Sequence, residues 1–277
     1  MQPWIIVLIV FAALLLLFPV LIFAPARPGK KKKAAFYGKN IAHRGLYQKD
    51  QSIPENSLPA FARAVENGYG MELDVQLSRD GKVVVFHDDT LERVCGVPKR
   101  VDELDYAELQ KLRLCGTEEK IPLFDEVLAT VAGKTPIIVE LKTGPRNGEL
   151  CEKTLAALRS YAGETCIESF DPTIVAWFRK HAPDIYRGQL AQPPKYYRKY
   201  GKSALVSFLL GTCALNLIAR PNFIAYRIGK KTFGVHLAEF LGATRVAWTS
   251  REESTEKKFD VVIFEHYLPK PQYKNLK

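Results

Sequence analysis

The chain has 277 residues and a formal net charge of +10, with 47% hydrophobic and 25% charged residues. This length leaves room for one (β/α)8 barrel, which typically needs about 250 residues, and a short N-terminal segment. Five widely spaced cysteines with no Cys-x-x-Cys pair argue against a disulfide framework or a zinc site and suit a reducing compartment. Nucleic acid is not expected as a partner, because five of the basic residues, Arg27 and Lys30 to Lys33, directly follow an apolar segment.

The apolar segment from Trp4 to Ala24 contains no charged residue and is long enough for a hydrocarbon core that needs about 20 residues. We expect residues 1–26 to form an uncleaved transmembrane anchor. A cleaved signal peptide is the competing interpretation, but Met1-Gln2-Pro3 lacks the basic side chain of a positive n-region. The lysines predict a basic juxtamembrane linker over residues 27–38. By the positive-inside rule they also predict a single-pass protein of the cell membrane with a cytoplasmic catalytic domain.

Residues 39–277 alternate between strand-like and helix-like patterns, which predicts an α/β fold, a (β/α)8 TIM barrel preceded by one N-terminal transmembrane helix. Strands are expected at residues 40–45, 71–77, 83–86, 136–142, 165–170, 184–192, 245–249 and 260–264. Helices are expected at residues 57–67, 101–114, 122–132, 150–161 and 172–181. Asp80-Gly81 predicts a tight hairpin turn. One strand-like run is left over, so we expect residues 223–228 to be an extended piece after the sixth strand, with Trp248 on the seventh.

An uncharged run from Ser203 to Ala219 follows a stretch rich in lysine and tyrosine. It could be a buried barrel helix, because it is shorter than the about 18 residues of a spanning helix. Alternatively, residues 196–219 could contact the membrane, with apolar side chains in lipid and the preceding basic and tyrosine residues at the headgroups. The sequence leaves both interpretations open.

Polar residues lie at or near the C-terminal ends of the first strands, where barrels keep their active sites. Glu72 and Asp74 are two residues apart, so both carboxylates point to one face of a strand, where they repel each other. A Ca²⁺ or Mg²⁺ ion relieves that repulsion, since both prefer carboxylate oxygen. The alternative is that one carboxylate pairs with Arg44 and the other is solvated, with His43 and His87 as hydrogen-bonded core histidines.

Several ordered motifs resemble the glycerophosphodiester phosphodiesterase family, over about residues 38 to 270. They are His43-Arg44-Gly45, Pro54-Glu55-Asn56-Ser57, Glu72-Leu73-Asp74-Val75, His87-Asp88, Val139-Glu140-Leu141-Lys142, Glu168-Ser169-Phe170-Asp171 and Val246-Ala247-Trp248-Thr249. The chain departs from the family pattern at Ser250-Arg251, where Val-Asn often follows Trp-Thr, and at Phe264-Glu265, where Thr-Asp is usual.

The resemblance implies a phosphoric diester hydrolase that converts glycerophosphodiesters, with a divalent metal, to glycerol 3-phosphate and an alcohol. We expect His43 and His87 to share general base and general acid catalysis, because an imidazole titrates near neutral pH. The remaining expected roles are metal binding by Glu72, Asp74 and Glu140, and substrate binding by Arg44, Lys142, Glu55 and Trp248.

Two alternatives differ in substrate or in class. A lysophospholipase D-like or phospholipase C-like enzyme would act on membrane lipids, which the expected anchor and the run at residues 203–219 favour. A non-catalytic membrane-bound binding protein on the same barrel would be favoured by loss of a site residue, but both histidines and all three carboxylates are present.

Overall fold

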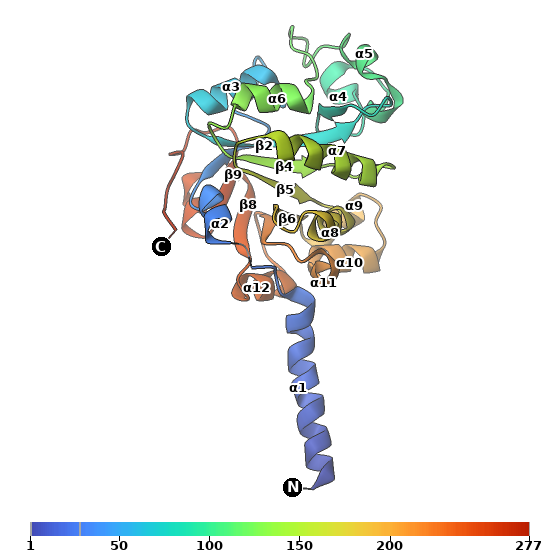
Figure 1. Cartoon of the computed structure of the whole chain (residues 1–277), viewed down its shortest axis with the longest axis vertical. Helices are drawn as coiled ribbons and strands as arrows, with labels where there is room; N and C mark the ends of the chain where they lie inside the picture. The colour runs from blue at the N-terminus through green and yellow to red at the C-terminus, as the bar shows by residue number, and fades with distance from the viewer. Residues whose placement is uncertain (1, 28, 277) are drawn as a thin grey trace.

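In the computed structural model, which describes residues 2–27 and 29–276, eight parallel strands close into a barrel and a ninth strand is attached to it (Figure 1). The first barrel strand pairs with both the second and the last, which closes the ring. In order, the barrel strands are β1 (Asn40–Ala42), β2 (Gly70–Leu77), β4 (Ile137–Leu141), β5 (Thr165–Ser169), β6 (Tyr186–Ala191), β7 (Phe223–Arg227), β8 (Thr244–Ser250) and β9 (Val261–Phe264). The predicted barrel is confirmed; Met1, Pro28 and Lys277, which the expected domain boundaries include, lie outside the described residues.

Helices surround the barrel, and hydrogen-bonding side chains start several of them. The Ser57 hydroxyl accepts a hydrogen bond from the Ala60 N–H, and the Asp171 carboxylate accepts one from the Thr173 N–H. The longer helices of the barrel domain are α3 (Leu58–Glu66), α6 (Phe124–Val131), α7 (Asn147–Ser160), α8 (Pro172–His181), α10 (Ala204–Gly211) and α12 (Phe233–Phe240). The shorter ones are α4 (Glu92–Cys95), η1 (Val101–Glu103), α5 (Tyr106–Leu109), α9 (Pro194–Lys199), α11 (Asn216–Ala219) and η2 (Glu253–Lys257).

Alternation along each strand separates an inner apolar cluster from the cluster under the helices. Ile138 and Cys166 belong to the inner cluster, whereas Val139 and Ile167, one residue further along, pack with the helices. Two residues further along each strand, on the same inner face, lie Glu140 on β4 and Glu168 on β5, and both are buried. The inner face therefore changes from apolar to acidic towards the C-terminal ends of the strands.

The short strand β3 (Val83–Val85) pairs antiparallel with β2 and takes no place in the ring. The turn before it contains Gly81 at φ +77°, a left-handed conformation that glycine adopts without a side-chain clash. Counting this hairpin strand as a barrel strand is why the expectation for residues 223–228 is wrong. The run forms β7, which pairs with β6 and β8, and Trp248 lies on the seventh barrel strand as expected.

The predicted helix at residues 101–114 is also wrong, because two short turns, η1 and α5, replace it. Asp105 and Glu108 form a capping box that starts α5 as a separate helix. This region packs over Val84 and Phe86 in a small cluster of its own, beside the end of the hairpin. That cluster supports the strand end from which His87 follows.

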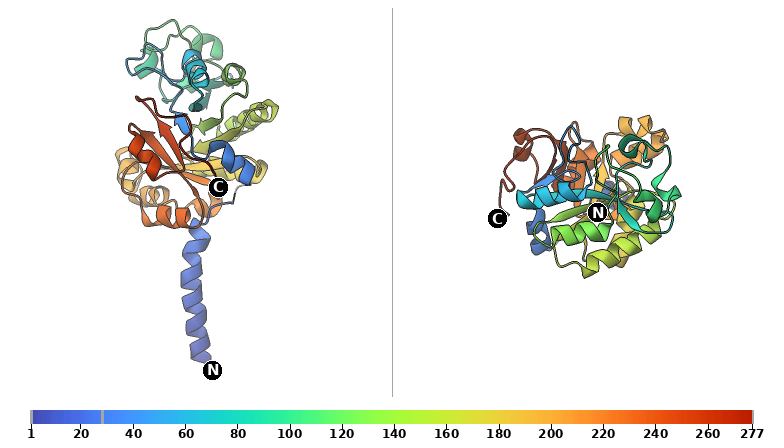
Figure 2. Two further views of the ribbon diagram at one scale, coloured as in Figure 1. Left: turned by 90° about the vertical axis from the view of Figure 1, so that its left-hand side faces the viewer. Right: turned by 90° about the horizontal axis from the view of Figure 1, so that it is seen from above.

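The N-terminal helix α1 (Pro3–Phe23) projects from the side of the barrel domain, beside α11 and α12 (Figures 1 and 2). Among residues 2–27 and 29–276, no helix combines the length and apolar character needed to cross a membrane, so the predicted spanning anchor is not confirmed. The expected linker contains a helix, α2 (Lys30–Phe36), whose last residue is buried. The Phe36 ring stacks on Tyr186 at a centroid distance of 5.8 Å and closes the N-terminal end of the barrel.

The run at residues 203–219 forms α10 and α11 rather than one buried helix. Ser207 and Gly211 face inward, whereas Leu205 and Phe208 are exposed. A helix with small residues inside and large apolar residues outside does not fit the buried-helix interpretation.

Gly188 on β6 leaves room inside the barrel for the ring of Phe223. A Cβ atom at Gly188 would lie 1.9 Å from the nearest ring carbon of that buried side chain. We expect Gly188→Ala to lower the free energy of unfolding by about 1–3 kcal/mol, the usual cost of overpacking a core. Urea unfolding followed by circular dichroism measures this.

Gly148→Ala in α7 is the matched control, because a Cβ atom there meets no atom within 4 Å. It should unfold at the same urea concentration as the parent or slightly above it, since alanine favours helix. Equal stability of the two variants would contradict the packing of Phe223 against Gly188.

Candidate active site

A cavity of about 400 Å³ opens at the C-terminal ends of the barrel strands. Charged and aromatic side chains from widely separated parts of the chain line it. Among the lining residues are His43, Arg44, Glu72, His87, Glu140, Glu168, Arg227, Trp248, Arg251 and Glu265. Six of the nine residues expected at the site line this cavity. The other three contact lining residues: Glu55 and Asp74 lie beside Arg44, and Lys142 lies beside Glu140.

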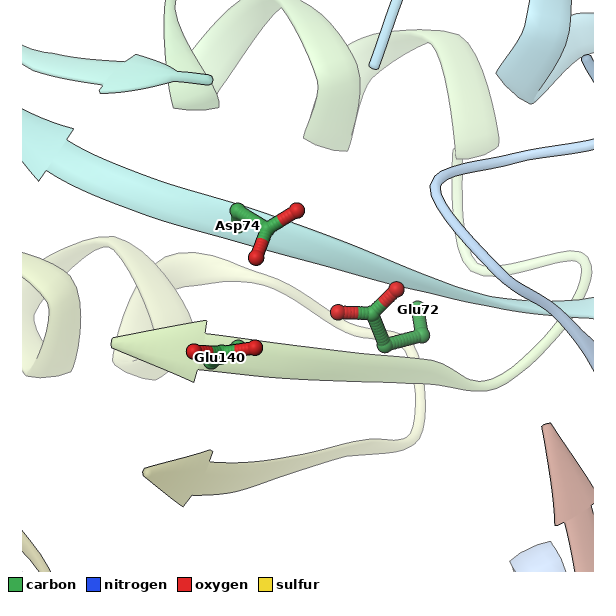
Figure 3. Close-up of side chains that lie close together, drawn as sticks. All are labelled: Glu72, Asp74 and Glu140. Atoms are coloured by element: carbon green, nitrogen blue, oxygen red, sulfur yellow. The ribbon is translucent and has the colours of Figure 1, made fainter. Parts of the chain in front are cut away.

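Three buried carboxylates from adjacent strands come together at the inner face (Figure 3). Glu72 and Asp74 lie on β2, and Asp74 is in register with Glu140 on β4. Each offers an oxygen within 4.8 Å of the others, close enough to share one cation. The alternation of side chains along β2 therefore places Glu72 and Asp74 on one face, as predicted.

The pKa values of Glu72 and Asp74 reflect the repulsion between the carboxylates of this cluster. Burial, followed by the charges of Asp74 and Glu140, holds the pKa of Glu72 well above its usual value. Burial would also raise the pKa of Asp74, but His87, Lys142 and Arg44 outweigh it and keep the pKa low. In the absence of a cation, Glu72 thus tends to hold a proton beside an ionised Asp74.

The donor set fits a hard divalent cation. Asp74 Oδ1 is buried and makes no hydrogen bond within the described residues, and its nearest cation is the Lys142 ammonium at 3.5 Å. Carboxylate oxygens without hydrogen-bond donors are the ligands that Ca²⁺ and Mg²⁺ take up. Neighbouring Glu72 and Glu140 complete an all-oxygen group of the predicted composition.

Glu168 on β5 adds a fourth buried carboxylate that the sequence reasoning did not assign to the site. It lies in register with Glu140 and lines the cavity. Burial and the charges of Glu140 and Asp74 raise its pKa well above the usual value, and Glu168 Oε2 makes no hydrogen bond in the described part of the chain. Its place in the period-two pattern, two residues after Cys166, is the signal that could have identified it.

Two cations lie beside the carboxylates. The Arg44 guanidinium donates a hydrogen bond to Glu55 Oε1 at 2.6 Å and lies 3.7 Å from Asp74 Oδ2. Its main-chain N–H, in a residue at φ +53°, donates to Glu72 Oε2 at 3.0 Å. The Lys142 ammonium bonds Glu140 Oε1 at 2.8 Å. Both cations are thereby fixed by the acidic cluster.

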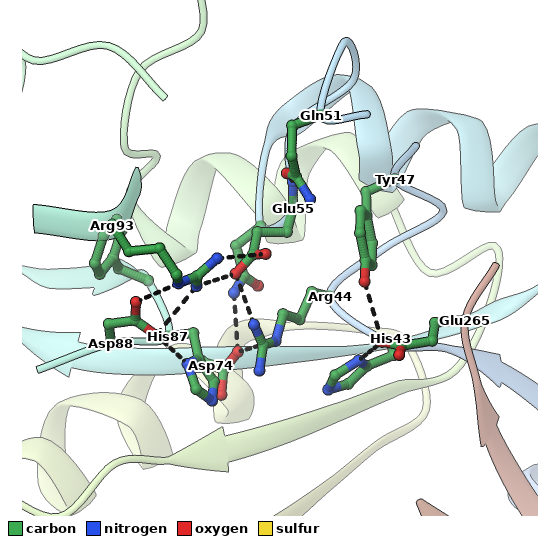
Figure 4. A network of polar contacts seen from close by, with 12 residues as sticks. His43, Arg44, Tyr47, Gln51, Glu55, Asp74, His87, Asp88, Arg93 and Glu265 are labelled. Atoms are coloured by element: carbon green, nitrogen blue, oxygen red, sulfur yellow. Dashed lines mark hydrogen bonds and ion pairs between the residues drawn. The ribbon is translucent and has the colours of Figure 1, made fainter. Parts of the chain in front are cut away.

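Glu55, which is expected to bind substrate, contacts two arginines, and its role in substrate binding stays a prediction. It is buried between Arg44 and Arg93, whose guanidinium nitrogens lie 2.6 Å from Glu55 Oε1 (Figure 4). Arg93 in turn bonds Asp88. Glu55 is not among the residues that line the cavity, so its contacts are those of a residue that positions Arg44.

His43 is oriented by Glu265, which the sequence reasoning noted only as a departure from the family pattern. The Nδ1 atom of His43 lies 2.8 Å from Glu265 Oε2, which also accepts a hydrogen bond from Tyr47. Burial would raise the pKa of Glu265, but hydrogen bonds from His43, Arg251 and Tyr47 keep it low. An ionised carboxylate only accepts, so it places the proton on Nδ1 and leaves Nε2 as the acceptor.

His87 is held in a similar way on the other side of the cluster (Figure 4). Its Nδ1 atom lies 2.5 Å from Asp88 Oδ1. Burial opposes ionisation of Asp88, but the contacts with His87 and Arg93 keep its pKa low. Each of the two cavity histidines therefore has its Nδ1 atom engaged by a carboxylate, and Nε2 is the ring nitrogen outside that contact.

Trp248 forms part of an aromatic wall on the far side of the cavity. Its indole N–H donates to the Ala225 carbonyl at 2.9 Å, and its ring meets Phe170 edge-to-face at 5.5 Å. Arg227 lies over the same ring, with its guanidinium carbon 5.8 Å from the centroid. The predicted position of Trp248 at the site agrees with this arrangement, and its role in binding stays a prediction.

The sequence and the fold were compared with known proteins. A model of the glycerophosphoryl diester phosphodiesterase family matches residues 43–263. A glycerophosphodiester phosphodiesterase of Caldanaerobacter subterraneus is 34% identical over 55% of this chain and 66% of its own length. A human lysophospholipase D is 33% identical over 56% of this chain and half of its own length.

Among solved structures, an Oleispira antarctica phosphodiesterase in complex with sn-glycerol-3-phosphate matches with a TM-score of 0.67. At 24% identity, over 82% of this chain and 93% of that chain, this likeness supports the fold alone. The family model, by contrast, spans most of this chain and includes both histidines and the strands β2 and β4 that carry the three carboxylates. The chain therefore belongs to the glycerophosphoryl diester phosphodiesterase family.

Proposed function

We propose that the protein hydrolyses glycerophosphodiesters to glycerol 3-phosphate and an alcohol, with one divalent metal. The observation that carries the proposal is the group of three buried carboxylates flanked by two carboxylate-held imidazoles. Membership in the phosphodiesterase family and the name of the Caldanaerobacter relative support the same reaction. A binding protein would have no need for a matched pair of oriented histidines.

The metal would be held by Glu72, Asp74 and Glu140, and when bound it supplies charge stabilisation to the phosphoryl oxygens. Glu168 lies on the same inner face, in register with Glu140, and would change the net charge of the carboxylate group. Arg44 can hold phosphate oxygens with its planar guanidinium, since Glu55 fixes its orientation.

The two histidines divide the proton transfers. His43, with its proton on Nδ1, takes a proton at Nε2 from the attacking oxygen. If that oxygen is water, glycerol 3-phosphate forms directly; if it is a glycerol hydroxyl of the substrate, a cyclic phosphodiester forms and a water molecule then opens it to glycerol 3-phosphate. The pKa of His43 is lowered, chiefly by burial and then by Arg44, so the ring is neutral and ready to act as a base near neutral pH. His87 protonates the leaving alkoxide from the other side, supported by Asp88.

Replacing either histidine tests these roles. We expect His43→Ala and His87→Ala each to lower kcat at least about 10²-fold, the usual contribution of a general acid or base. Release of glycerol 3-phosphate from glycerophosphocholine is the measurement. His236→Ala, on the exposed surface of α12, is the control and should keep parental activity. Near-parental turnover in His87→Ala would remove that residue from the mechanism.

Glu265 is expected to act through the tautomer of His43. In Glu265→Gln the side-chain amide can donate to Nδ1, which moves the proton to Nε2 and removes the base; we expect kcat to fall at least about 10-fold with KM little changed. Tyr47→Phe is the control, because it removes one hydrogen bond to Glu265 but keeps the carboxylate. Equal kcat values in the two variants would show that Glu265 does not set the tautomer.

Lysophospholipids are a second candidate substrate class, favoured by the likeness to the human lysophospholipase D. We expect glycerophosphocholine to yield glycerol 3-phosphate. An assay of the same protein on lysophosphatidylcholine decides whether a lipid arm is accepted. Both substrates are assayed with Ca²⁺ and with Mg²⁺. Lysophosphatidic acid as product indicates a lysophospholipase D reaction, and monoacylglycerol a phospholipase C reaction. No turnover of either diester with either metal would favour a non-catalytic binding protein.

We also propose that α1 holds the chain at the cytoplasmic face of a membrane. The helix has 21 residues, its described large apolar side chains are mostly exposed to solvent, and the basic residues Lys30 to Lys33 follow it. Such side chains are stabilised in lipid, and lysines beside them are attracted to anionic headgroups. Extraction of expressed membranes at alkaline pH tests this, since release of the whole protein into the supernatant would contradict integral attachment.

A further inference from the structure

The side of the barrel domain nearest α1 exposes large apolar side chains. They come from three helices, α10, α11 and α12, and include Leu205, Phe208, Leu217, Ile218, Phe233 and Phe240. Phe240 is 86% exposed and Phe233 is 71% exposed, values unusual for phenylalanine in a protein surrounded only by water. We call these six residues the apolar rim.

The apolar rim adjoins the foot of α1. The last residue of α1, Phe23, packs edge-to-face on Phe233 at 6.5 Å, and α1 also contacts α11. Figure 1 shows α10, α11 and α12 on the side of the barrel domain from which α1 projects, whereas α5 lies on the opposite side. The apolar surface of α1 is therefore continued sideways by the barrel domain.

Positive charge is concentrated in the same part of the chain. Residues 185–238 contain nine Lys and Arg residues and no Asp or Glu, and Arg27 to Lys33 contain five more. Outside these two stretches, the 26 remaining basic residues are outnumbered by the 30 acidic residues. Exposed members such as Lys199, Lys202 and Lys230 flank the helices of the apolar rim.

Exposed apolar side chains next to uncompensated lysines match the chemistry of an anionic bilayer surface, with acyl chains below phosphate headgroups. We propose that the barrel docks on an anionic membrane through α10, α11 and α12, with the apolar rim in the lipid and the lysines at the headgroups. A nucleic acid would satisfy the lysines but leave the six apolar side chains in water. This docking does not require α1 to span the bilayer.

Docking in this orientation brings the active-site cavity close to the lipid. A second cavity of about 560 Å³ lies beside it, lined by Pro194, Lys195, Tyr196, Lys230 and Phe233, and Ile228 lines both. Between them Arg227 lies over Tyr196, with its guanidinium carbon 4.3 Å from the ring centroid. If the proposed function holds, a diester in the membrane surface would reach the carboxylate cluster through this amphiphilic groove.

Fluorescence quenching of the full-length protein in vesicles tests the docking without using turnover. Bimane is attached at Leu205→Cys or Phe240→Cys, and at Lys111→Cys next to α5 as the distant control. The parent protein gives the background from its own thiols. In phosphatidylcholine vesicles containing phosphatidylserine and acyl-chain nitroxides, we expect quenching at residues 205 and 240 and none at 111.

Two results would overturn the proposal. One is a lack of quenching at both rim positions in vesicles to which the protein is bound, which would mean that α1 alone makes the contact. The other is shielding of both fluorophores by a short DNA duplex instead of by vesicles.

Charge reversal separates this proposal from the proposed reaction. In the labelled proteins, Lys199→Glu combined with Lys202→Glu should abolish the extra quenching that phosphatidylserine produces, while hydrolysis of glycerophosphocholine stays at the parental rate. Lys111→Glu combined with Lys120→Glu, at exposed positions near α5, is the control and should leave quenching unchanged. Unchanged quenching in the 199/202 variant with an unaltered Tm would contradict the docking, whatever the enzyme turns over.

Discussion

Repulsion between acidic side chains facing the inside of the barrel is the constraint on which the rest of the site depends. Glu72, Asp74, Glu140 and Glu168 are buried on three consecutive strands, and the register of those strands places them side by side. Burying unpaired charge is costly, so the site must contain cations or protons. Arg44 and Lys142 supply part of the compensation, and a divalent ion would supply the rest.

The surrounding structure holds the proton-transfer groups against this cluster by a second set of carboxylates. Glu265, at the end of β9, fixes His43 beside β1, and Asp88 fixes His87 after the β3 hairpin. The histidine that each acid contacts lowers the pKa of that acid, and an arginine adds to the effect, Arg251 for Glu265 and Arg93 for Asp88. The acids inside the barrel thus differ in role from Glu265 and Asp88, which follow strand ends: the first group binds positive charge, and the second orients imidazoles.

Local pattern in the sequence was enough for most of the fold and for the core of the site. Period-two alternation predicted that Glu72 and Asp74 lie on one face. The prediction is correct because β2 pairs with β4 in regular parallel register. The count of barrel strands failed because pairing partners are not local: Val83–Val85 reads as a strand equal to the others, yet it pairs only with the outer end of β2. The ion pair between Glu55 and Arg93 could not be predicted for the same reason, since the two residues are 38 positions apart in the sequence. Glu265 was missed because its contact with His43 joins the two ends of the barrel domain.

Whether the three carboxylates share one divalent cation can be measured by isothermal titration of the purified full-length protein with Ca²⁺ and with Mg²⁺. We expect one saturable site per chain for at least one of these ions. The site should be lost in Glu72→Gln and in Glu140→Gln, and kept in Glu149→Gln, which lies on α7 and does not line the cavity. Absence of binding by the parent, or equal binding by parent and both site variants, would contradict a shared cation.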